Sequence, residues 1–256
     1  MARAVFKVFL VLAIATVALP GTANDRKPAR ARGDQVLKST EIYDLISPSV
    51  VIIRTEGARP GQRSQGTGFI VAGNLVLSNR HIVAGKEKVF IEIPAGGPAE
   101  VPTRSVSTDR PPQFIRPIDR VLASHPSDDL VLLEVSGLPP APTLKLSPVT
   151  PRIGRKVYII SNIFGFERSI QESIIAGHRV INEQELLQLD GAFGPGSSGG
   201  IVVDEDGLLV GMTVARYSKS SAIGFAAPID RLRKFLVTTT CRASGSKKIK
   251  IDSVAC

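Results

Sequence analysis

The segment GPGSSGGIVV, Gly194 to Val203, places two serines between glycines and then runs into branched aliphatic residues. A segment with so few side-chain atoms has three interpretations. It can be a flexible polar loop, a phosphate-binding loop, or a tight turn that presents a serine nucleophile beside unobstructed backbone N–H groups. A Walker-type phosphate loop needs Lys followed by Ser or Thr and opens a helix, whereas residues 201–203 indicate a strand. A solvated linker fits poorly, because the segment lies between two apolar stretches. The nucleophile interpretation is favoured, and it requires a base, an orienting acid and oxyanion donors elsewhere in the chain.

The rest of the chain is patterned mainly as short strands. Hairpin turns are indicated at Gly73-Asn74 and at 204–207, and glycine, proline and polar clusters separate the other runs. Short helices are expected at 42–46 and at 228–238. This pattern predicts an all-β sandwich or barrel with a short C-terminal helix. The strand-like runs are 49–57, 67–83, 88–94, 129–135, 156–161, 173–181 and 199–217.

The N-terminus has the features of a secretory signal peptide. Arg3 and Lys7 flank an apolar run at 8–19, and Gly21 and Ala23 supply the small residues of a cleavage site. The run is shorter than the roughly 20 apolar residues of a spanning helix, so cleavage is favoured over a membrane anchor. We therefore expect an exported protein, periplasmic or extracellular, with no membrane span after cleavage.

The C-terminal end is basic and carries both cysteines. The formal charge is +9 at pH 7, and residues 231–256 hold seven basic side chains against one acidic one. Such a tail can bind an anionic surface, but no aromatic interleaving or nucleic-acid motif accompanies it, so specific nucleic-acid binding is not expected. Cys241 and Cys256 can close a disulfide loop in an oxidising compartment, worth about 3 kcal/mol in the chain-entropy model. Free or intermolecular thiols are the alternatives, and we expect no metal or cofactor.

Three histidines are candidates for the base. His125 lies in a loop-like segment, His178 in a strand-like stretch, and His81 just after a strand of the first hairpin. Any one of them alone is more often a surface or core histidine than a catalyst. His81 differs from the other two in the segment that surrounds it, NLVLSNRHIVAG.

Several segments resemble motifs of the trypsin-like serine proteases of the HtrA (Deg) type. The His motif is similar to GTGFIVAGNLVLSNRHIVAG, the acid motif to SHPSDDLVLLEV, and the nucleophile motif to LLQLDGAFGPGSSGGIVVDEDGLLVGMTVA, followed by SAIGFAAPID. The linking stretch KVYIISNIFGFERSIQESIIAG also resembles the family. The resemblance covers roughly residues 40–236 in family order, so the joint signal is strong although each piece alone is weak. It implies a chymotrypsin-like fold of two six-stranded antiparallel β-barrels.

The resemblance also implies a catalytic triad. By position, His81 is the general base, Asp129 the orienting acid and Ser198 the nucleophile, with the acid holding the imidazole in the tautomer that accepts the serine proton. Asp128 is the rival acid, but Asp129 immediately precedes an apolar strand and matches the family position. The backbone N–H groups of Gly196 and Ser198 would form the oxyanion hole.

The same comparison gives a primary specificity pocket. It places Ala192 at the base of the pocket and Thr213, Val214 and Ala215 along its wall. None of these side chains can receive the charge of Lys or Arg, so small aliphatic substrate residues are expected there. A protein or peptide substrate would lie extended along the strand at 213–215 and pair through its backbone.

Three positions depart from the family pattern. Ser197 and Gly194 stand where Asn is usual, and Ser161-Asn162-Ile163 stands where Gly-Asn-Pro is usual. These changes concern the loops and leave every member of the triad in place. No PDZ domain, as many relatives carry, and no activation cleavage of the trypsin kind are expected, and self-assembly into a homo-oligomer is left open.

We therefore predict an exported serine endopeptidase that acts on unfolded or extended proteins. The alternatives are a catalytically silent or latent protease-fold binding protein, or chaperone, and an anion-binding exported domain led by the basic tail. The predicted organisation is a signal peptide at 1–23, a flexible segment at 24–38, a protease domain at 39–240 (first barrel 49–149 with a surface loop at 94–117, second barrel 150–227, C-terminal helix 228–238) and a basic tail at 241–256.

Overall fold

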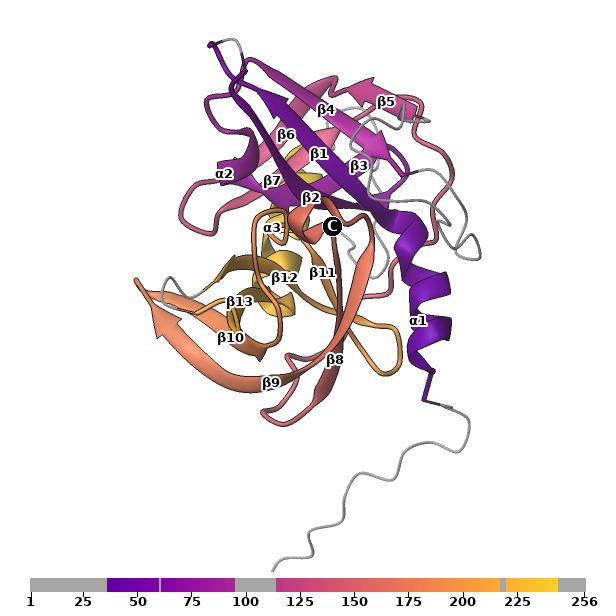
Figure 1. The fold of residues 1–256 in the computed structure, drawn as a ribbon, viewed down its shortest axis with the longest axis vertical. Helices are drawn as coiled ribbons and strands as arrows, with labels where there is room; N and C mark the ends of the chain where they lie inside the picture. The colour runs from indigo at the N-terminus through magenta and orange to yellow at the C-terminus, as the bar shows by residue number, and fades with distance from the viewer. Residues whose placement is uncertain (1–35, 60, 95–113, 217–219, 244–256) are drawn as a thin grey trace, which may run out of the picture. The chain divides into compact units, whose positions relative to one another are not determined.

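The structure is a computed structural model that describes residues 36–59, 61–94, 114–216 and 220–243. All of these residues belong to one unit, residues 35–256. The expected signal peptide, Cys256 and most of the proline-rich loop at 94–117 lie outside the described residues. Figure 1 shows two strand assemblies with short helices around them, and each assembly carries one part of the predicted site.

The first assembly is a seven-stranded antiparallel sheet. Its strand order is β5-β4-β1-β2-β3-β7-β6 (Figure 1). Alternating apolar residues of β1 and β3 point into a core of their own, which includes Ile53, Val76 and Ile91. The strands are β1 (Val50–Glu56), β2 (Arg63–Ala72), β3 (Leu75–Asn79), β4 (Lys88–Ile93), β5 (Phe114–Pro117), β6 (Arg120–His125) and β7 (Leu130–Glu134).

The two edges of this sheet approach each other at one end. The Ile118 N–H donates to Val89 O of β4, and the next N–H, of Asp119, donates to Glu134 O at the end of β7. The chain thus crosses from one edge to the other within two residues, which requires the sheet to curl. In the described residues no ladder joins β5 to β6, so the predicted six-stranded first barrel is instead a curled sheet of seven strands. The extra strand β5 is short and ends at a proline, which explains why the sequence indicated only a loop there.

The second assembly is a closed antiparallel barrel of six strands, as predicted. Its order is β10-β13-β12-β11-β8-β9, and it encloses a separate core around Ile159, Leu187, Phe193 and Val210. Closure gives every strand two hydrogen-bonded neighbours. The strands are β8 (Lys156–Ser161), β9 (Ser169–Ile181), β10 (Gln184–Asp190), β11 (Ile201–Asp204), β12 (Leu209–Arg216) and β13 (Ile223–Pro228).

A third, shared core joins the two assemblies. It combines Phe69 and Leu77 of the sheet with Ile160 and Met212 of the barrel and with Leu232 of the C-terminal helix. All five side chains are fully buried. This core therefore packs the sheet, the barrel and the C-terminal helix against one another.

The helices are few and short. They are α1 (Ser39–Ile46), α2 (Arg80–Val83) and α3 (Ile229–Ala243), with single 3-10 turns η1 (Ser47–Ser49) and η2 (Ile163–Gly165). In the expected flexible segment at 24–38, the Leu37 N–H donates to Glu205 O, so this residue is tied to the barrel. Within the ranges that the structure describes, no helix is both long and apolar enough to cross a membrane.

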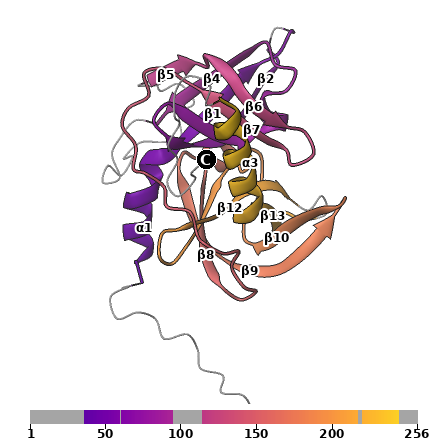
Figure 2. The same ribbon diagram turned by 180° about the vertical axis from the view of Figure 1, so that it is seen from behind.

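The C-terminal helix extends beyond its predicted end at 238. Three consecutive threonines made continuation unfavourable on propensity. In the structure the hydroxyls of Thr238 and Thr239 donate to the carbonyls of Lys234 and Phe235, four residues earlier, so these polar groups are satisfied along the helix. Figure 2 shows α3 against β12 and β13. Cys241 lies in this helix, and the disulfide predicted with Cys256 stays a prediction.

Candidate active site

His81 and Asp129 are in direct contact. The His81 ring Nδ1 lies 2.6 Å from Asp129 Oδ2, and the His81 backbone N–H donates to Asp129 Oδ1 at 2.8 Å. α2 begins directly after β3 and places the ring at the surface, where its side chain is 50% exposed against 28% for Asp129. The predicted base and acid therefore meet through two atoms of each residue, which fixes both the ring and the carboxylate.

Asp129 occupies an unusual backbone conformation. It ends the turn between β6 and β7 with φ of +55°, in the left-handed region, which Asp and Asn tolerate better than most other side chains. Its carbonyl accepts from the Arg80 N–H at 3.0 Å and from Asn79 Nδ2 at 3.1 Å. The turn is therefore bound through its backbone as well as its side chain to the segment that carries His81.

The serine segment forms the tight turn that the sequence indicates. Gly196 has φ of +92°, and a Cβ added there would lie 2.2 Å from the carbonyl oxygen of Asn162. Gly199 has φ of +82°, and its Cβ would lie 1.8 Å from the carbonyl oxygen of Thr67. Only glycine fits these two positions, because both the backbone conformation and the neighbouring carbonyls exclude a side chain.

Thr67 of β2 is a residue that the sequence analysis did not single out. Its hydroxyl donates to Gly196 O at 2.6 Å, and its backbone N–H donates to Ser198 O at 2.8 Å. Its own carbonyl accepts from the Ser78 hydroxyl at 2.6 Å. Thr67 is fully buried and thus connects the serine turn to the strand that leads to His81. The signal available in the sequence was a threonine between two glycines, directly before the apolar end of the strand.

The two amides predicted to form the oxyanion hole are not used by the fold. Among the described residues, neither the Gly196 N–H nor the Ser198 N–H donates to a protein acceptor, whereas Ser197 N–H donates to Gly194 O and Phe164 N–H donates to Pro195 O. In the same part of the chain, no hydrogen bond joins the Ser198 hydroxyl to the His81 ring. The structure thus brings the predicted base and acid into contact and places Ser198 on a turn that is bound to Thr67 of β2.

The predicted pocket residues differ in their surroundings. Thr213 is buried, and its hydroxyl donates to the carbonyls of Ser197 and Gly200. Its side chain therefore supports the serine turn, and the predicted place of Thr213 along the pocket wall stays a prediction. Ala192 is exposed and is held through its backbone by the side chain of Gln171.

The other two wall residues lie where β12 is irregular. The pairing of β12 with β13 shifts between Thr213 and Ala215, which leaves Val214 in a bulge. The Val214 side chain packs against the shared core. Ala215 is placed only by its backbone in β12.

The rival candidates point elsewhere. Asp128 binds Arg231 through Oδ1 and lies 3.2 Å from His125 through Oδ2. His178 Nε2 lies 2.9 Å from the carbonyl oxygen of Pro151. Among the described residues, His81 is therefore the histidine that is hydrogen-bonded to Asp129, whereas His125 and His178 have other partners.

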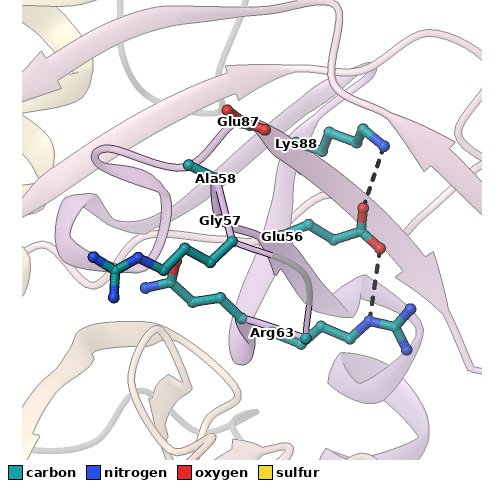
Figure 3. Close-up of a pocket in the computed structure, with 9 residues that line it drawn as sticks. Glu56, Gly57, Ala58, Arg63, Glu87 and Lys88 are labelled. Atoms are coloured by element: carbon teal, nitrogen blue, oxygen red, sulfur yellow. Dashed lines mark ion pairs between the residues drawn. The ribbon is translucent and has the colours of Figure 1, made fainter.

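A surface hollow of about 360 Å³ lies at the tip of the hairpin of β1 and β2 (Figure 3). Glu56 sits between Lys88 and Arg63, with N···O distances of 3.4 and 3.7 Å. None of the predicted site residues lines this hollow. These two ion pairs are partly exposed, and pairs of this kind contribute little free energy.

A strand sheet that bears a His–Asp pair, beside a barrel that bears a glycine-bounded serine, defines the chymotrypsin-like class of peptidase folds. The chain belongs to the trypsin-like peptidase domain family, whose model matches residues 66–212.

Curated relatives agree with the resemblance to HtrA proteases. The chain is 29% identical over 211 residues to the mitochondrial serine protease HTRA2 of Bos taurus, covering 77% of this chain and 42% of that protein. It is also 29% identical over 186 residues to a probable periplasmic DegP-like serine endoprotease of Hahella chejuensis, covering 69% and 35%. The chain thus spans less than half the length of these relatives.

Solved structures give the same fold. An HtrA-type protease, AlgW with a tripeptide, has a TM-score of 0.62 at 25% identity, covering 78% of this chain and 62% of that one. A protease from M. tuberculosis in its active form has a TM-score of 0.63 at 20% identity, covering 84% and 90%. The second likeness concerns the fold alone.

Proposed function

We propose that this protein is an exported serine endopeptidase that hydrolyses peptide bonds through His81, Asp129 and Ser198. The observation that carries the proposal is the two-point contact between His81 and Asp129 at the positions of the family motifs. An ionised carboxylate only accepts hydrogen bonds, so Nδ1 of the ring carries the proton toward Asp129 and Nε2 is left to accept one. A structural histidine has no need of this arrangement beside a glycine-bounded serine.

The reaction follows from these roles. His81 Nε2 takes the proton of the Ser198 hydroxyl while Oγ attacks the substrate carbonyl carbon, and the amides of Gly196 and Ser198 bind the resulting oxyanion. The tetrahedral intermediate collapses when His81 returns the proton to the leaving amine, which gives an acyl-enzyme ester. A water molecule then attacks the ester with His81 again as base, releasing the acid product and restoring Ser198.

The substrate is a protein or peptide in an extended conformation. Thr213 already exchanges backbone hydrogen bonds with the serine turn, through Gly199 N–H to its carbonyl and its own N–H to Gly200 O. The bulge at Val214 is therefore the part of β12 that we assign to backbone pairing with substrate. Ala192 and Ala215 leave no carboxylate for a basic side chain, which favours small aliphatic residues at the primary position.

Export rests on the N-terminal pattern and on the DegP-like relatives, which are named periplasmic. Other relatives are named mitochondrial or chloroplastic. We place this protein in the periplasm or outside the cell because a charged start, a short apolar run and small residues at 21 and 23 are typical of a secretory signal.

One observation favours a second candidate, a latent or silent binding protein. Within the described residues the Ser198 hydroxyl is not hydrogen-bonded to the ring of His81. A resting state of this kind would hold unfolded chains without cutting them until the serine turn moves. Apo structures of active enzymes often show similarly loose catalytic contacts, so the endopeptidase remains the first proposal.

Labelling with a fluorophosphonate probe tests the proposal. Wild type should be labelled and should cleave an unfolded protein, whereas Ser198→Ala should do neither while keeping its fold by circular dichroism. Ser197→Ala is the matched control, because its hydroxyl accepts only the Gly194 N–H at 3.1 Å within the turn. It should keep substantial labelling. A folded wild type that is never labelled would favour the binding protein.

A further inference from the structure

The turn that carries Asp129 is also bound from the opposite side by the C-terminal helix. Arg231, in the first turn of α3, donates from Nη2 and Nε to Asp128 Oδ1 at 2.6 and 3.1 Å. Its third nitrogen, Nη1, donates to Glu185 O of β10 at 3.0 Å. The Arg231 side chain is only 14% exposed. One guanidinium thus ties together α3, the barrel and the turn of the sheet.

Asp128 has a second partner, on the turn itself. Its backbone N–H donates to His125 Nδ1 at 3.1 Å, and its Oδ2 lies 3.2 Å from the same nitrogen. Asp128 is therefore fixed by His125 on one side and by Arg231 on the other. Because Asp128 and Asp129 share a peptide bond, the position of one restricts the other.

Asp129 depends on such restraints. A side chain in the left-handed region costs roughly 1–2 kcal/mol relative to the right-handed one, so the turn does not select this conformation by itself. Contacts from Asn79, Arg80 and His81 hold it on the side of the sheet. Strain of this kind persists only where the surroundings over-determine the backbone.

We propose that Arg231 is a positioning residue that holds Asp129 against His81 by clamping Asp128. This inference rests on the proposed function of Ser198, His81 and Asp129. It makes the orientation of the acid depend on the docking of α3, although in the described residues no hydrogen bond or ion pair joins α3 to His81, Asp129 or Ser198. Loosening the helix would let the turn relax and would weaken the contact that sets the His81 tautomer.

The test compares Arg231→Gln with Arg233→Gln. Arg233 lies on the same helix and also binds one carboxylate, Asp230, and one backbone carbonyl, Ser147 O, but it does not touch the turn. With a fluorophosphonate probe, Arg231→Gln should lower the maximal rate of labelling by about ten- to a hundredfold with little change in the probe concentration for half-maximal rate. Arg233→Gln should leave both near wild type at a temperature where each variant is folded. Arg231→Lys, which keeps the charge but not the fork, should recover only part of the rate.

A double variant distinguishes action through Asp128 from a general loss of stability. If Arg231 acts through Asp128, Arg231→Gln combined with Asp128→Asn should be no slower than Arg231→Gln alone. Multiplying effects, or equal losses in the Arg231 and Arg233 variants, would overturn the proposal.

The contact can also be observed without turnover. The proton on His81 Nδ1, shared with Asp129, should give a strongly downfield proton NMR signal in wild type and Arg233→Gln, and Arg231→Gln should shift or broaden it. This readout separates the two proposals. A wild type that shows the signal but is never labelled defeats the proposed protease and leaves the clamp standing, whereas an unchanged signal in Arg231→Gln defeats the clamp.

Discussion

The two strand assemblies hold their parts of the proposed site in different ways. In the curled sheet, His81 and Asp129 are joined by side-chain atoms, with the ring and the carboxylate in direct contact. In the closed barrel, the turn at Ser198 is bound mainly at its own backbone groups, which accept from and donate to neighbouring residues, and only glycine fits at two of its positions. The first part depends on an imidazole and a carboxylate that contact each other, and the second depends on the absence of a side chain at Gly196 and Gly199.

Thr67 links the sheet to the serine turn and uses both a side-chain and a backbone group to do so. It belongs to the sheet, yet it binds two carbonyls of the serine turn, one through its hydroxyl and one through its backbone. Thr213 binds the same turn from the side of the barrel. The serine is thus held between a threonine of each assembly, and substitutions can probe each mode separately.

The largest effect is expected at Asp129, in the part that depends on side-chain chemistry. Asp129→Asn keeps a side chain that tolerates the left-handed backbone, so the variant should fold. It should lower kcat by about 10⁴-fold, because an amide that donates to the ring favours the wrong tautomer. Asp128→Asn is the control: its Oδ1 can still accept from Arg231, so kcat should fall far less. A larger loss at position 128 would mean that the acid has been misassigned.

A somewhat smaller effect is expected from filling the space at Gly196. Gly196→Ala should lower kcat by about 10²–10³-fold, because the methyl group would meet the Asn162 carbonyl and displace an oxyanion donor. Gly73→Ala is the matched control, since Gly73 also has positive φ but has open space around it. Both variants carry the same type of backbone strain, so thermal melting should fall in both and activity only in the first. Equal activity in the two variants would show that the turn tolerates a side chain.

Removing the Thr67 hydroxyl should affect both activity and stability. Thr67→Val leaves Gly196 O without its donor in the interior, which costs about 1–3 kcal/mol, and should reduce kcat by roughly tenfold as the turn loosens. Thr67→Ser should restore much of both. Thr55→Val serves for comparison, because Thr55 is also buried but its hydroxyl binds Ser64 within the β1–β2 hairpin. Denaturant unfolding and kcat, measured on all three, separate the loss of a buried hydrogen bond from its consequence for the site.

The difference between the two modes also explains what the sequence could predict. The turn with its two serines was predicted because bare glycines around a serine are a local signal, and Gly196 and Gly199 prove to be required by carbonyls that a Cβ would touch. Ser198, His81 and Asp129 were assigned their roles through motifs in family order. Thr67 and Arg231 were missed because their partners lie 129 and 103 residues away in the chain. No local pattern contains such a pairing, which only packing of the two assemblies creates.

The fold was also predicted in part: one strand assembly matches the prediction and the other differs from it. The runs of branched residues predicted only an all-β sandwich or barrel, whereas the closed six-stranded barrel was implied by the family resemblance and was confirmed. The sheet was expected as a second six-stranded barrel, but β5 arises from a short stretch before Pro117 that pairs with β4 only at an edge. The position of Thr213 on a pocket wall stays a prediction, and the structure adds that its hydroxyl satisfies the buried carbonyl of Ser197.

The smallest effect concerns stability alone, in the barrel far from the side-chain pair. Burial raises the pKa of Asp204, whose Oδ1 accepts from the backbone N–H groups of Asp206 and Leu208. A folded-state pKa above the unfolded value means that stability is greatest below the unfolded pKa and is lost as pH rises through the folded one. Asp204→Asn keeps the acceptor without the charge, so its melting temperature should exceed that of wild type above this window.

Below the window the advantage of Asp204→Asn should vanish, since wild type is then protonated as well. Asp204→Ala removes the acceptor and should be destabilised at every pH, by about 1–3 kcal/mol. Melting temperatures of the three proteins from about pH 3 to 7, a range that begins below the unfolded pKa of an aspartate, give the comparison. A constant difference between Asp204→Asn and wild type across this range would contradict the raised pKa.

The free edges of the curled sheet determine where the molecule opens first. Each strand of the barrel has hydrogen-bonded neighbours on both sides, whereas among the described strands β5 and β6 each have one neighbour. Amide hydrogens of the barrel should therefore exchange with solvent only in rare global openings, and those of β5 and β6 in frequent local ones. Since β6 leads directly into the turn of Asp129, warming would release the acid while Ser198 is still in place. The protein should then lose its proposed chemistry some degrees before it loses its fold.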